Sequence, residues 1–143
     1  MKTLPAFLLI FVAGLLISGD TPIHGRQPPG DDRKDILGLW RGGMPGDPPG
    51  SIELVITPAN ITGRNPRTGK SLGEGTYQLD PATKRIDARH SERAGRGKTY
   101  LGIYSLEGNT LRWCSNSRLK KRPSSLQHRP DTDQFLMILE RQK

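Results

Sequence analysis

The sequence predicts an all-β protein, a small up-and-down antiparallel barrel of about eight strands. Short segments in which apolar and polar residues alternate are separated by glycine- and proline-rich turn signals, with no convincing helical period between them. Successive segments lie close together along the chain, which favours pairing between sequence neighbours and hence a barrel over a sandwich. A barrel of about eight strands is just wide enough to be filled by its own side chains or to hold one small ligand.

The first residues are expected to be a leader rather than part of the barrel. Lys2 provides a positive start, and residues 6–17 form an apolar run of secretory-signal length that is too short to span a membrane. We therefore expect a cleaved signal peptide over 1–19, a flexible linker over 20–34 and the barrel domain over 35–143. The product would be exported to the periplasm or the extracellular space, with no transmembrane span left after signal cleavage.

Residues 31–35, where the linker ends, are all charged, and an Asp among them could cap a single helical turn. The strands predicted after it in the first part of the domain lie at 36–41, 51–57, 60–63, 73–79 and 85–89. In the second of these, Ile52, Leu54 and Ile56 share one face, which is the pattern of a half-buried strand. In the last, Ile86 and Ala88 are expected to point inward.

The rest of the domain is organised around a predicted β-hairpin over 102–114. If Gly108 and Asn109 form a two-residue turn, the register is fixed by that turn. It then places opposite each other Leu106 and Leu111, Tyr104 and Trp113, and Ile103 and Cys114. The final strand, 134–141, is apolar on both faces, so we expect it to be central or covered on both sides.

The composition bounds the partners and the source of stability. The formal net charge is +8, so the exported protein is expected to collect at anionic envelope surfaces. No signature of a nucleic-acid-binding module is present, so specific recognition of nucleic acid is not expected. The single cysteine, Cys114, leaves no intramolecular disulfide to hold the fold, and we expect it to be a small buried strand residue.

Several short motifs occur in a characteristic order along the domain. They are Gly38-x-Trp40, Gly75-Thr-Tyr77-x-Leu79-Asp80-Pro81, Gly102-Ile-Tyr104-x-Leu106-x-Gly108-x-Thr110-Leu111 before Cys114, Arg122-Pro123, and a closing apolar strand that ends at Arg141. In these motifs the chain resembles an uncharacterised lipocalin-like domain family of exported planctomycete proteins, over nearly the whole region from about Asp35 to Lys143. The family has no established activity, so the resemblance implies a fold more than a function.

The resemblance also implies one structural contact. In lipocalins the Trp of the Gly-x-Trp motif packs at the closed end of the barrel, and an Arg of the last strand lies over it. Trp40 and Arg141 match these positions here. We therefore predict that the Arg141 guanidinium stacks on the Trp40 indole, a contact that contributes about 0.5–2 kcal/mol.

Two groups of residues are candidate contacts for a ligand. The densest basic cluster, on a loop at one end of the barrel, consists of Arg118, Lys120, Lys121 and Arg122. It is either a solvated charged face or a patch that steers an anionic ligand or surface to the barrel mouth. The aromatic candidates are Tyr77, Tyr104 and Trp113. We expect them to be core residues, and contact with a ligand is the alternative role.

No residues suggest catalysis, a cofactor or a metal. The three histidines, His24, His90 and His128, are not at metal-ligand spacing with one another or with Cys114. His90 could form an acid–base pair with Glu92, but solvated polar residues at a strand end are the commoner arrangement. We therefore predict no metal site, no cofactor and no nucleophile of the Gly-x-Ser-x-Gly type.

The expected function is that of an exported, non-enzymatic, monomeric lipocalin-like binding or interaction module. Its partner would be a small apolar or anionic ligand, or an anionic envelope surface. The alternative is a structural envelope or matrix protein with a filled barrel, and a hydrolase or isomerase comes third. An apolar cavity of about 300 Å³ or more would favour binding, and a filled interior would favour the structural role.

Overall fold

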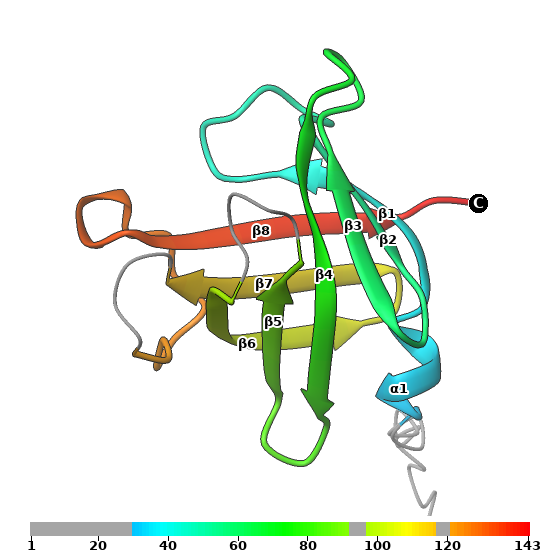
Figure 1. Cartoon of the computed structure of the whole chain (residues 1–143), viewed down its shortest axis with the longest axis vertical. Helices are drawn as coiled ribbons and strands as arrows, with labels where there is room; N and C mark the ends of the chain where they lie inside the picture. Colours follow the sequence, from blue (N-terminus) through cyan, green and yellow to red (C-terminus); the bar gives the residue numbers. More distant parts are fainter. Residues whose placement is uncertain (1–29, 92–96, 117–120) are drawn as a thin grey trace, which may run out of the picture.

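The strands of the chain pair in sequence order and close into a barrel (Figure 1). The computed structural model describes residues 30–91, 97–116 and 121–143, so the predicted signal peptide and most of the predicted linker lie outside the described residues. Every strand is antiparallel to its neighbours, and the first strand pairs with the last. The predicted fold class, a small up-and-down barrel, is confirmed. In the described ranges no helix is long and apolar enough to cross a membrane.

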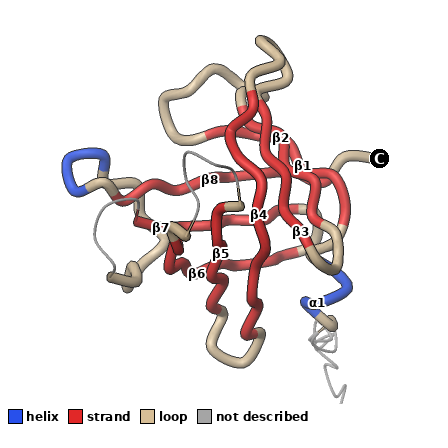
Figure 2. The backbone as a smooth tube through the Cα atoms, in the orientation of Figure 1, coloured by secondary structure: helices blue, strands red, loops and turns tan. Residues whose placement is uncertain are grey.

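The described elements are short, and two small helices lie on opposite sides of the barrel (Figure 2). In chain order they are α1 (Asp32–Asp35), β1 (Gly38–Gly43), β2 (Ile52–Ile56), β3 (Asn60–Arg64), β4 (Ser71–Asp80), β5 (Arg85–His90), β6 (Thr99–Glu107), β7 (Thr110–Asn116), the 3-10 helix η1 (Pro130–Thr132) and β8 (Gln134–Arg141).

The β6–β7 hairpin has the predicted register. The pairs Leu106–Leu111, Tyr104–Trp113 and Ile103–Cys114 lie opposite each other. Gly108 has a φ of 57° at the first position of the turn, where a hairpin of this length favours glycine. Because side chains alternate across a strand, this register sends Tyr104 and Trp113 into the barrel and leaves Cys114 on its outer side.

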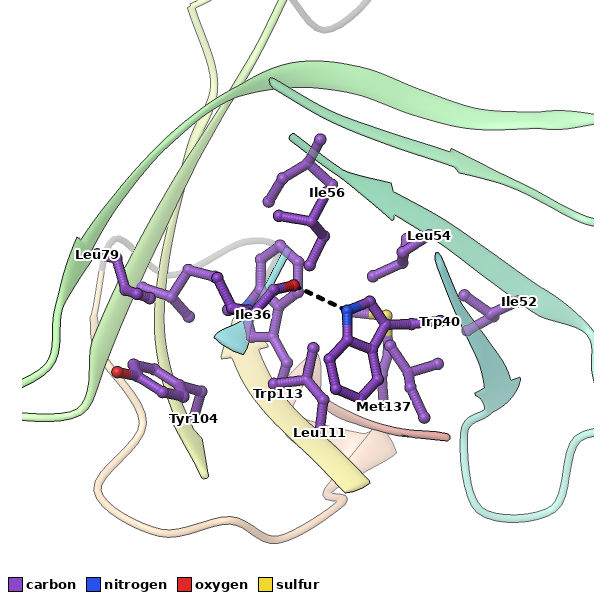
Figure 3. Packing of buried hydrophobic residues seen from close by; sticks show 13 residues of the cluster. Ile36, Trp40, Ile52, Leu54, Ile56, Leu79, Tyr104, Leu111, Trp113 and Met137 are labelled. Carbon is purple, nitrogen blue, oxygen red and sulfur yellow. Dashed lines mark hydrogen bonds between the residues drawn. The ribbon is translucent and has the colours of Figure 1, made fainter. Parts of the chain in front are cut away.

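Large apolar side chains fill the end of the barrel next to α1, which we call the closed end. Ile36, Trp40, Leu111 and Leu139 are fully buried there. Figure 3 shows the Trp40 indole beside Leu111 and Met137, with its Nε1 donating a hydrogen bond of 2.8 Å to the carbonyl oxygen of Ile36. The closed end is therefore a packed core that α1 and its C-cap cover.

The predicted stacking of Arg141 on Trp40 is confirmed. The guanidinium carbon of Arg141 lies 4.3 Å from the centroid of the Trp40 ring, and the two residues are paired on β8 and β1. The same guanidinium donates to the carbonyl oxygen of Leu37 at 2.8 Å and to that of Asp35. Arg141 thus fastens the end of α1 to the first and last strands, which stabilises closure of the barrel.

The last residues of the predicted linker belong to the folded domain. Asp31 caps α1 by accepting a hydrogen bond from the Arg33 amide, as expected for Asp at this position. Asp32 is buried, and its carboxylate accepts hydrogen bonds from the Tyr104 hydroxyl at 2.6 Å and from Lys84 Nζ at 2.5 Å. These contacts hold α1 on the barrel, so Asp31 and Asp32, which lie before the predicted boundary at residue 35, are part of the folded domain.

Only part of β8 is covered on both faces. Leu136 points outward and is buried, whereas Ile138, two residues on, is 38% exposed. The segment that covers the start of the strand is 121–129, where the Gln127 carbonyl oxygen accepts hydrogen bonds from Gln134 Nε2 and from Cys114 Sγ. The prediction that this strand is central or covered is confirmed by its pairing with both β7 and β1, although Ile138 remains exposed on the outer face.

Candidate functional site

An apolar cavity of about 320 Å³ lies inside the barrel at the end opposite α1, which we call the mouth. The side chains that line it come from strands β2 to β8. The inward-facing ones are Ile52, Leu54, Ile61, Ala88, His90, Tyr100, Trp113, Phe135 and Met137, and the cavity is also bordered by Gly63, by residues 72–76 of β4 and by Arg89. The volume is within the range of small-molecule sites and corresponds to about ten water molecules at about 30 Å³ each.

Small residues on three neighbouring strands leave this space. Gly63 of β3 pairs with Gly73 of β4, and Gly75 of β4 pairs with His90 of β5. Ala88 of β5 stands between Tyr77 and Tyr100 in the ladder. At the closed end the same strands carry larger side chains, so the interior is full at one end and hollow at the other.

His90 is the titratable side chain that the strands bring into the mouth. It continues the alternation of Ile86 and Ala88 along β5, so its imidazole faces inward and is half-buried. The ring lies where a side chain at Gly73 would otherwise be, because a Cβ at Gly73 would lie 2.5 Å from His90 Nε2. Its Nδ1 is buried and has no hydrogen-bond partner in the described part of the chain.

The expected environment of His90 differs from the observed one. A solvated strand end was predicted, whereas the strand ends at His90 with the ring inside the barrel wall. The inward positions of Ile86 and Ala88 were the signal in the sequence that could have identified it, since the next residue on that face is residue 90. Glu92, the suggested acid–base partner, lies outside the described residues.

The three aromatic candidates have different roles. Trp113 lines the cavity, and its Nε1 is buried without a hydrogen-bond partner among the described residues. Tyr77 donates its hydroxyl hydrogen to the Thr57 carbonyl oxygen at 2.8 Å, and Tyr104 donates to Asp32 at the closed end. Burial raises the pKa of Tyr77. The pKa of Tyr104 is also raised, mainly by burial and in second place by the hydrogen bond to Asp32. Of the three, Trp113 is thus the one that faces the cavity.

The predicted basic cluster is described only in part. Arg118 and Lys120 lie outside the described residues, and Lys121 is exposed. Arg122 forms an ion pair with Asp87, with Nη1 2.5 Å from one carboxylate oxygen, and donates to the Gly102 carbonyl oxygen at 2.7 Å. The hydrogen bond that Arg122 donates to the Asp87 carboxylate raises the pKa of Arg122. Arg122 therefore joins the segment after β7 to strands β5 and β6, and its guanidinium is already neutralised by a carboxylate.

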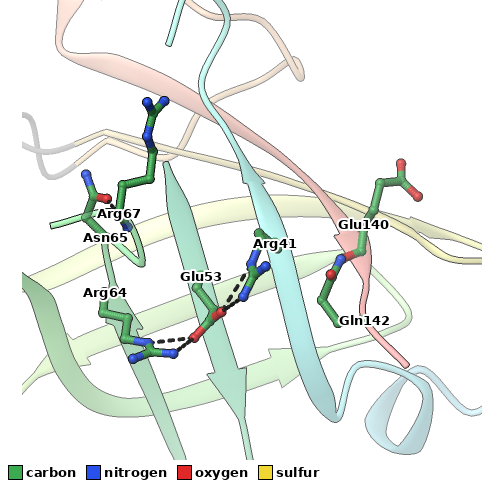
Figure 4. A network of polar contacts seen from close by, with 7 residues as sticks. All are labelled: Arg41, Glu53, Arg64, Asn65, Arg67, Glu140 and Gln142. Atoms are coloured by element: carbon green, nitrogen blue, oxygen red, sulfur yellow. Dashed lines mark hydrogen bonds and ion pairs between the residues drawn. The ribbon is translucent and has the colours of Figure 1, made fainter. Parts of the chain in front are cut away.

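A carboxylate on the outer surface was missed by the sequence-based prediction. Glu53 of β2 lies between Arg41 of β1 and Arg64 of β3 (Figure 4), and these three residues are direct neighbours in the ladder. Both arginines donate to the Glu53 carboxylate, Arg64 at 2.6 Å. The hydrogen bonds from Arg41 and then from Arg64 hold the pKa of Glu53 below its ordinary value of 4.5. The carboxylate is thus ionised and bonded to both arginines. This arrangement suits a structural contact between three strands better than an acid–base role.

The remaining titratable residues do not converge. The described ranges contain no group of three or more His, Cys, Asp or Glu that could hold a metal ion. Cys114 is buried beneath the 121–129 segment, and burial raises the pKa of its thiol. A raised pKa keeps the thiol protonated and unreactive, in line with its expected role as a buried strand residue.

The candidate site of this barrel is the mouth cavity, and His90 and Trp113 lie in its wall. Comparison of the chain with protein-family models, with curated proteins and with solved structures finds no match. The resemblance to the lipocalin-like family of exported planctomycete proteins therefore stays a prediction that rests on the motifs of the sequence. The function has to be argued from the cavity itself.

Proposed function

We propose that the protein is an exported, non-enzymatic, lipocalin-like binding module that takes a small and mainly apolar molecule into the mouth of its barrel. The observation that carries this proposal is the apolar cavity of about 320 Å³ at the mouth. Its volume lies at the lower end of the range of small-molecule sites, about 300–1,000 Å³. The proposal includes an N-terminal export signal and a monomeric protein.

The wall of the cavity supports binding for a second reason. On β5 the residue that borders the space is the small Ala88, while large residues such as Trp40 and Leu139 fill the interior at the closed end. A protein selected only for stability would gain from filling such a space, because cavity-filling substitutions commonly add about 0.5–2 kcal/mol. An open mouth beside a packed closed end is the arrangement that a binding protein requires.

The structural alternative is supported by the packed half of the barrel. Trp40, Tyr104 and Leu111 fill the closed end, and Arg141 and Asp32 tie α1 over it. These features give a stable scaffold, which a binding module and an envelope protein both need. They do not account for the empty mouth, so the binding role is preferred.

Naphthalene, an uncharged bicyclic aromatic molecule with no hydrogen-bonding group, is a suitable probe of the cavity. We expect it to bind and to shift the NMR signal of the Trp113 indole N–H, whereas the Trp40 indole signal at the closed end should move little. The variant Ala88→Leu places a larger side chain in the cavity and should weaken binding at least about tenfold, or about 1.4 kcal/mol.

The matched control is Val55→Leu. Val55 is 41% exposed on the outer face of β2, so the added methylene does not enter the barrel. Its affinity for naphthalene should equal that of the unsubstituted protein. Absence of binding to the unsubstituted protein, or equal binding by Ala88→Leu, would reject the binding function and favour the structural one.

A further inference from the structure

Aromatic rings and a few polar groups make up much of the cavity wall. Tyr100, Trp113 and Phe135 present aromatic rings from three strands, and His90 adds an imidazole. Aromatic side chains bind other aromatic rings in offset or edge-to-face arrangements, each contact adding to the effect of burial. The wall is therefore suited to a flat aromatic molecule more than to a flexible alkyl chain.

The imidazole of His90 is held in a defined position. The backbone N–H of His90 donates to the Lys98 carbonyl oxygen at 2.9 Å, which fixes the end of β5. The ring lies across Gly73, whose φ of 128° and missing side chain make room for it, and its centroid is 6.4 Å from that of Tyr100. A polar group fixed in this way loses little conformational entropy when a ligand contacts it, because its position is set beforehand.

That imidazole also has hydrogen-bonding capacity toward the cavity. Its Nδ1 is buried, without a partner in the part of the chain that the structure describes, so a ligand in the mouth can reach the ring only at its other edge, where Nε2 lies beside Gly73 of the cavity wall. A neutral imidazole carries one donor and one acceptor, so it can pair with a hydroxyl group or with a carboxylate.

We propose that the mouth binds a small aromatic molecule with one polar substituent, a hydroxyl or a carboxylate, which hydrogen-bonds to His90 while the ring system contacts Tyr100, Trp113 and Phe135. This inference rests on the proposed binding function and adds the chemical class of the ligand. The cavity volume, equal to about ten water molecules, fits a ligand of one or two fused rings.

Three related probes separate the two proposals. Naphthalene tests the apolar cavity alone, and naphthol and naphthoate add a hydroxyl and a carboxylate to the same ring system. Affinities are measured by titration followed through the Trp113 indole N–H signal. We expect at least one of the polar probes to bind the unsubstituted protein about tenfold more tightly than naphthalene does, and the preferred probe identifies the polar group.

Two substitutions at His90 assign the effect to the imidazole. His90→Phe keeps a ring but removes both nitrogens, so the advantage of the polar probe should disappear while the affinity for naphthalene stays within about twofold. His90→Gln retains a donor and an acceptor and should recover part of the advantage. Retained naphthalene binding also shows that the variants are folded.

The outcomes are distinct for the two proposals. If naphthalene binds the unsubstituted protein but neither polar probe binds more tightly, the role of His90 is wrong and the binding function stands. The same holds if His90→Phe keeps the full preference for the polar probe. If none of the three probes binds, both proposals fail.

Discussion

On strands β4 and β5 the two ends of the barrel carry residues of different size. At the closed end β4 and β5 contribute Leu79 and Ile86, whereas at the mouth they contribute Gly75 and Ala88. Polar groups differ in the same way. Tyr104 at the closed end has its hydrogen-bond partner in Asp32, while His90 at the mouth has a nitrogen without one. Among the described residues, this polar contact is satisfied at the closed end and a polar atom is left without a partner at the mouth.

This difference separates stability from function along the barrel axis. The closed end holds Trp40, Ile36 and Leu139 at zero exposure, so substitutions there should act mainly on the free energy of unfolding. The mouth contains space that a substitution can fill, so changes there should act mainly on binding. The comparison is therefore testable by pairing equivalent substitutions at the two ends.

The largest effect is expected from truncating Trp40. Trp40→Ala removes a fully buried indole together with its hydrogen bond to Ile36 and its contact with Arg141. The loss should be about 3–5 kcal/mol of unfolding free energy, measured by urea denaturation.

The two tryptophans provide the matched comparison for this effect. Trp40→Phe loses a hydrogen bond, whereas Trp113→Phe removes an Nε1–H that has no partner among the described residues. Trp40→Phe should therefore be the more destabilising by about 1 kcal/mol. Equal losses at the two positions would contradict the distinction between the ends.

A second comparison adds one methyl group at two inward-facing glycines. At Gly102, next to the packed core, a Cβ would lie 2.8 Å from the Ile86 carbonyl oxygen, 2.8 Å from Trp113 Nε1 and 2.9 Å from the Cys114 carbonyl oxygen. Two of these atoms are backbone and cannot move away easily. Gly102→Ala should therefore destabilise by about 1–3 kcal/mol in thermal or urea unfolding.

The same substitution at the mouth should have no such cost. At Gly63 a Cβ would be 3.1 Å from Leu54 Cδ2, the end of a flexible side chain that borders the cavity. Gly63→Ala should range from neutral to about 1 kcal/mol more stable, because alanine restricts the unfolded chain. If Gly63→Ala is as destabilising as Gly102→Ala, the mouth is packed and the cavity assignment fails.

A third comparison concerns Tyr104 at the closed end. Tyr104→Phe leaves Asp32 with Lys84 alone, so about 1.5 kcal/mol of unfolding free energy should be lost at neutral pH. Burial raises the folded-state pKa of Tyr104 above its ordinary value of 10.0. Its contribution is therefore fully present below that pH and is lost as the pH rises further, because only the unfolded chain then ionises. The gap between the protein and Tyr104→Phe should narrow in urea denaturation above about pH 10.

Tyr77→Phe is the control for this measurement. The Tyr77 hydroxyl donates to a backbone carbonyl at the exposed start of the β2–β3 turn rather than to a buried carboxylate. Its loss should be smaller and should change less with pH. An equal pH dependence of the two variants would show that the Asp32 contact is not the source of the effect.

The hairpin register was predictable because one short turn determines it. Gly108 and Asn109 fix the pairing of six residues on each side, and no distant part of the chain is involved. The contact between Trp40 and Arg141 was predicted only through the family resemblance, since nothing local connects the first strand with the last. Local turn chemistry and motif order were thus sufficient for the architecture.

The site could not be predicted to the same extent because it depends on register between several strands. The cavity is bordered where Gly63 lies opposite Gly73 and Ala88 lies opposite Tyr77, and this is decided by the β3–β4 and β4–β5 ladders together. Likewise, Glu53 is buried because Arg41 and Arg64 flank it across three strands joined by loops of unequal length. Composition shows the glycines and the charges, but their juxtaposition arises only in the closed barrel.

The pairing of β1 with β8 makes the barrel depend on contact between the two ends of the domain. Arg141 binds the Leu37 carbonyl oxygen across 104 residues of chain, and Gln142 donates to Leu39. Contacts so distant in sequence carry a large loop-closure entropy before they form, which slows folding. Because the ladder has no free edge once it is closed, the late step that joins the two ends also removes the strand edges through which partly folded chains aggregate.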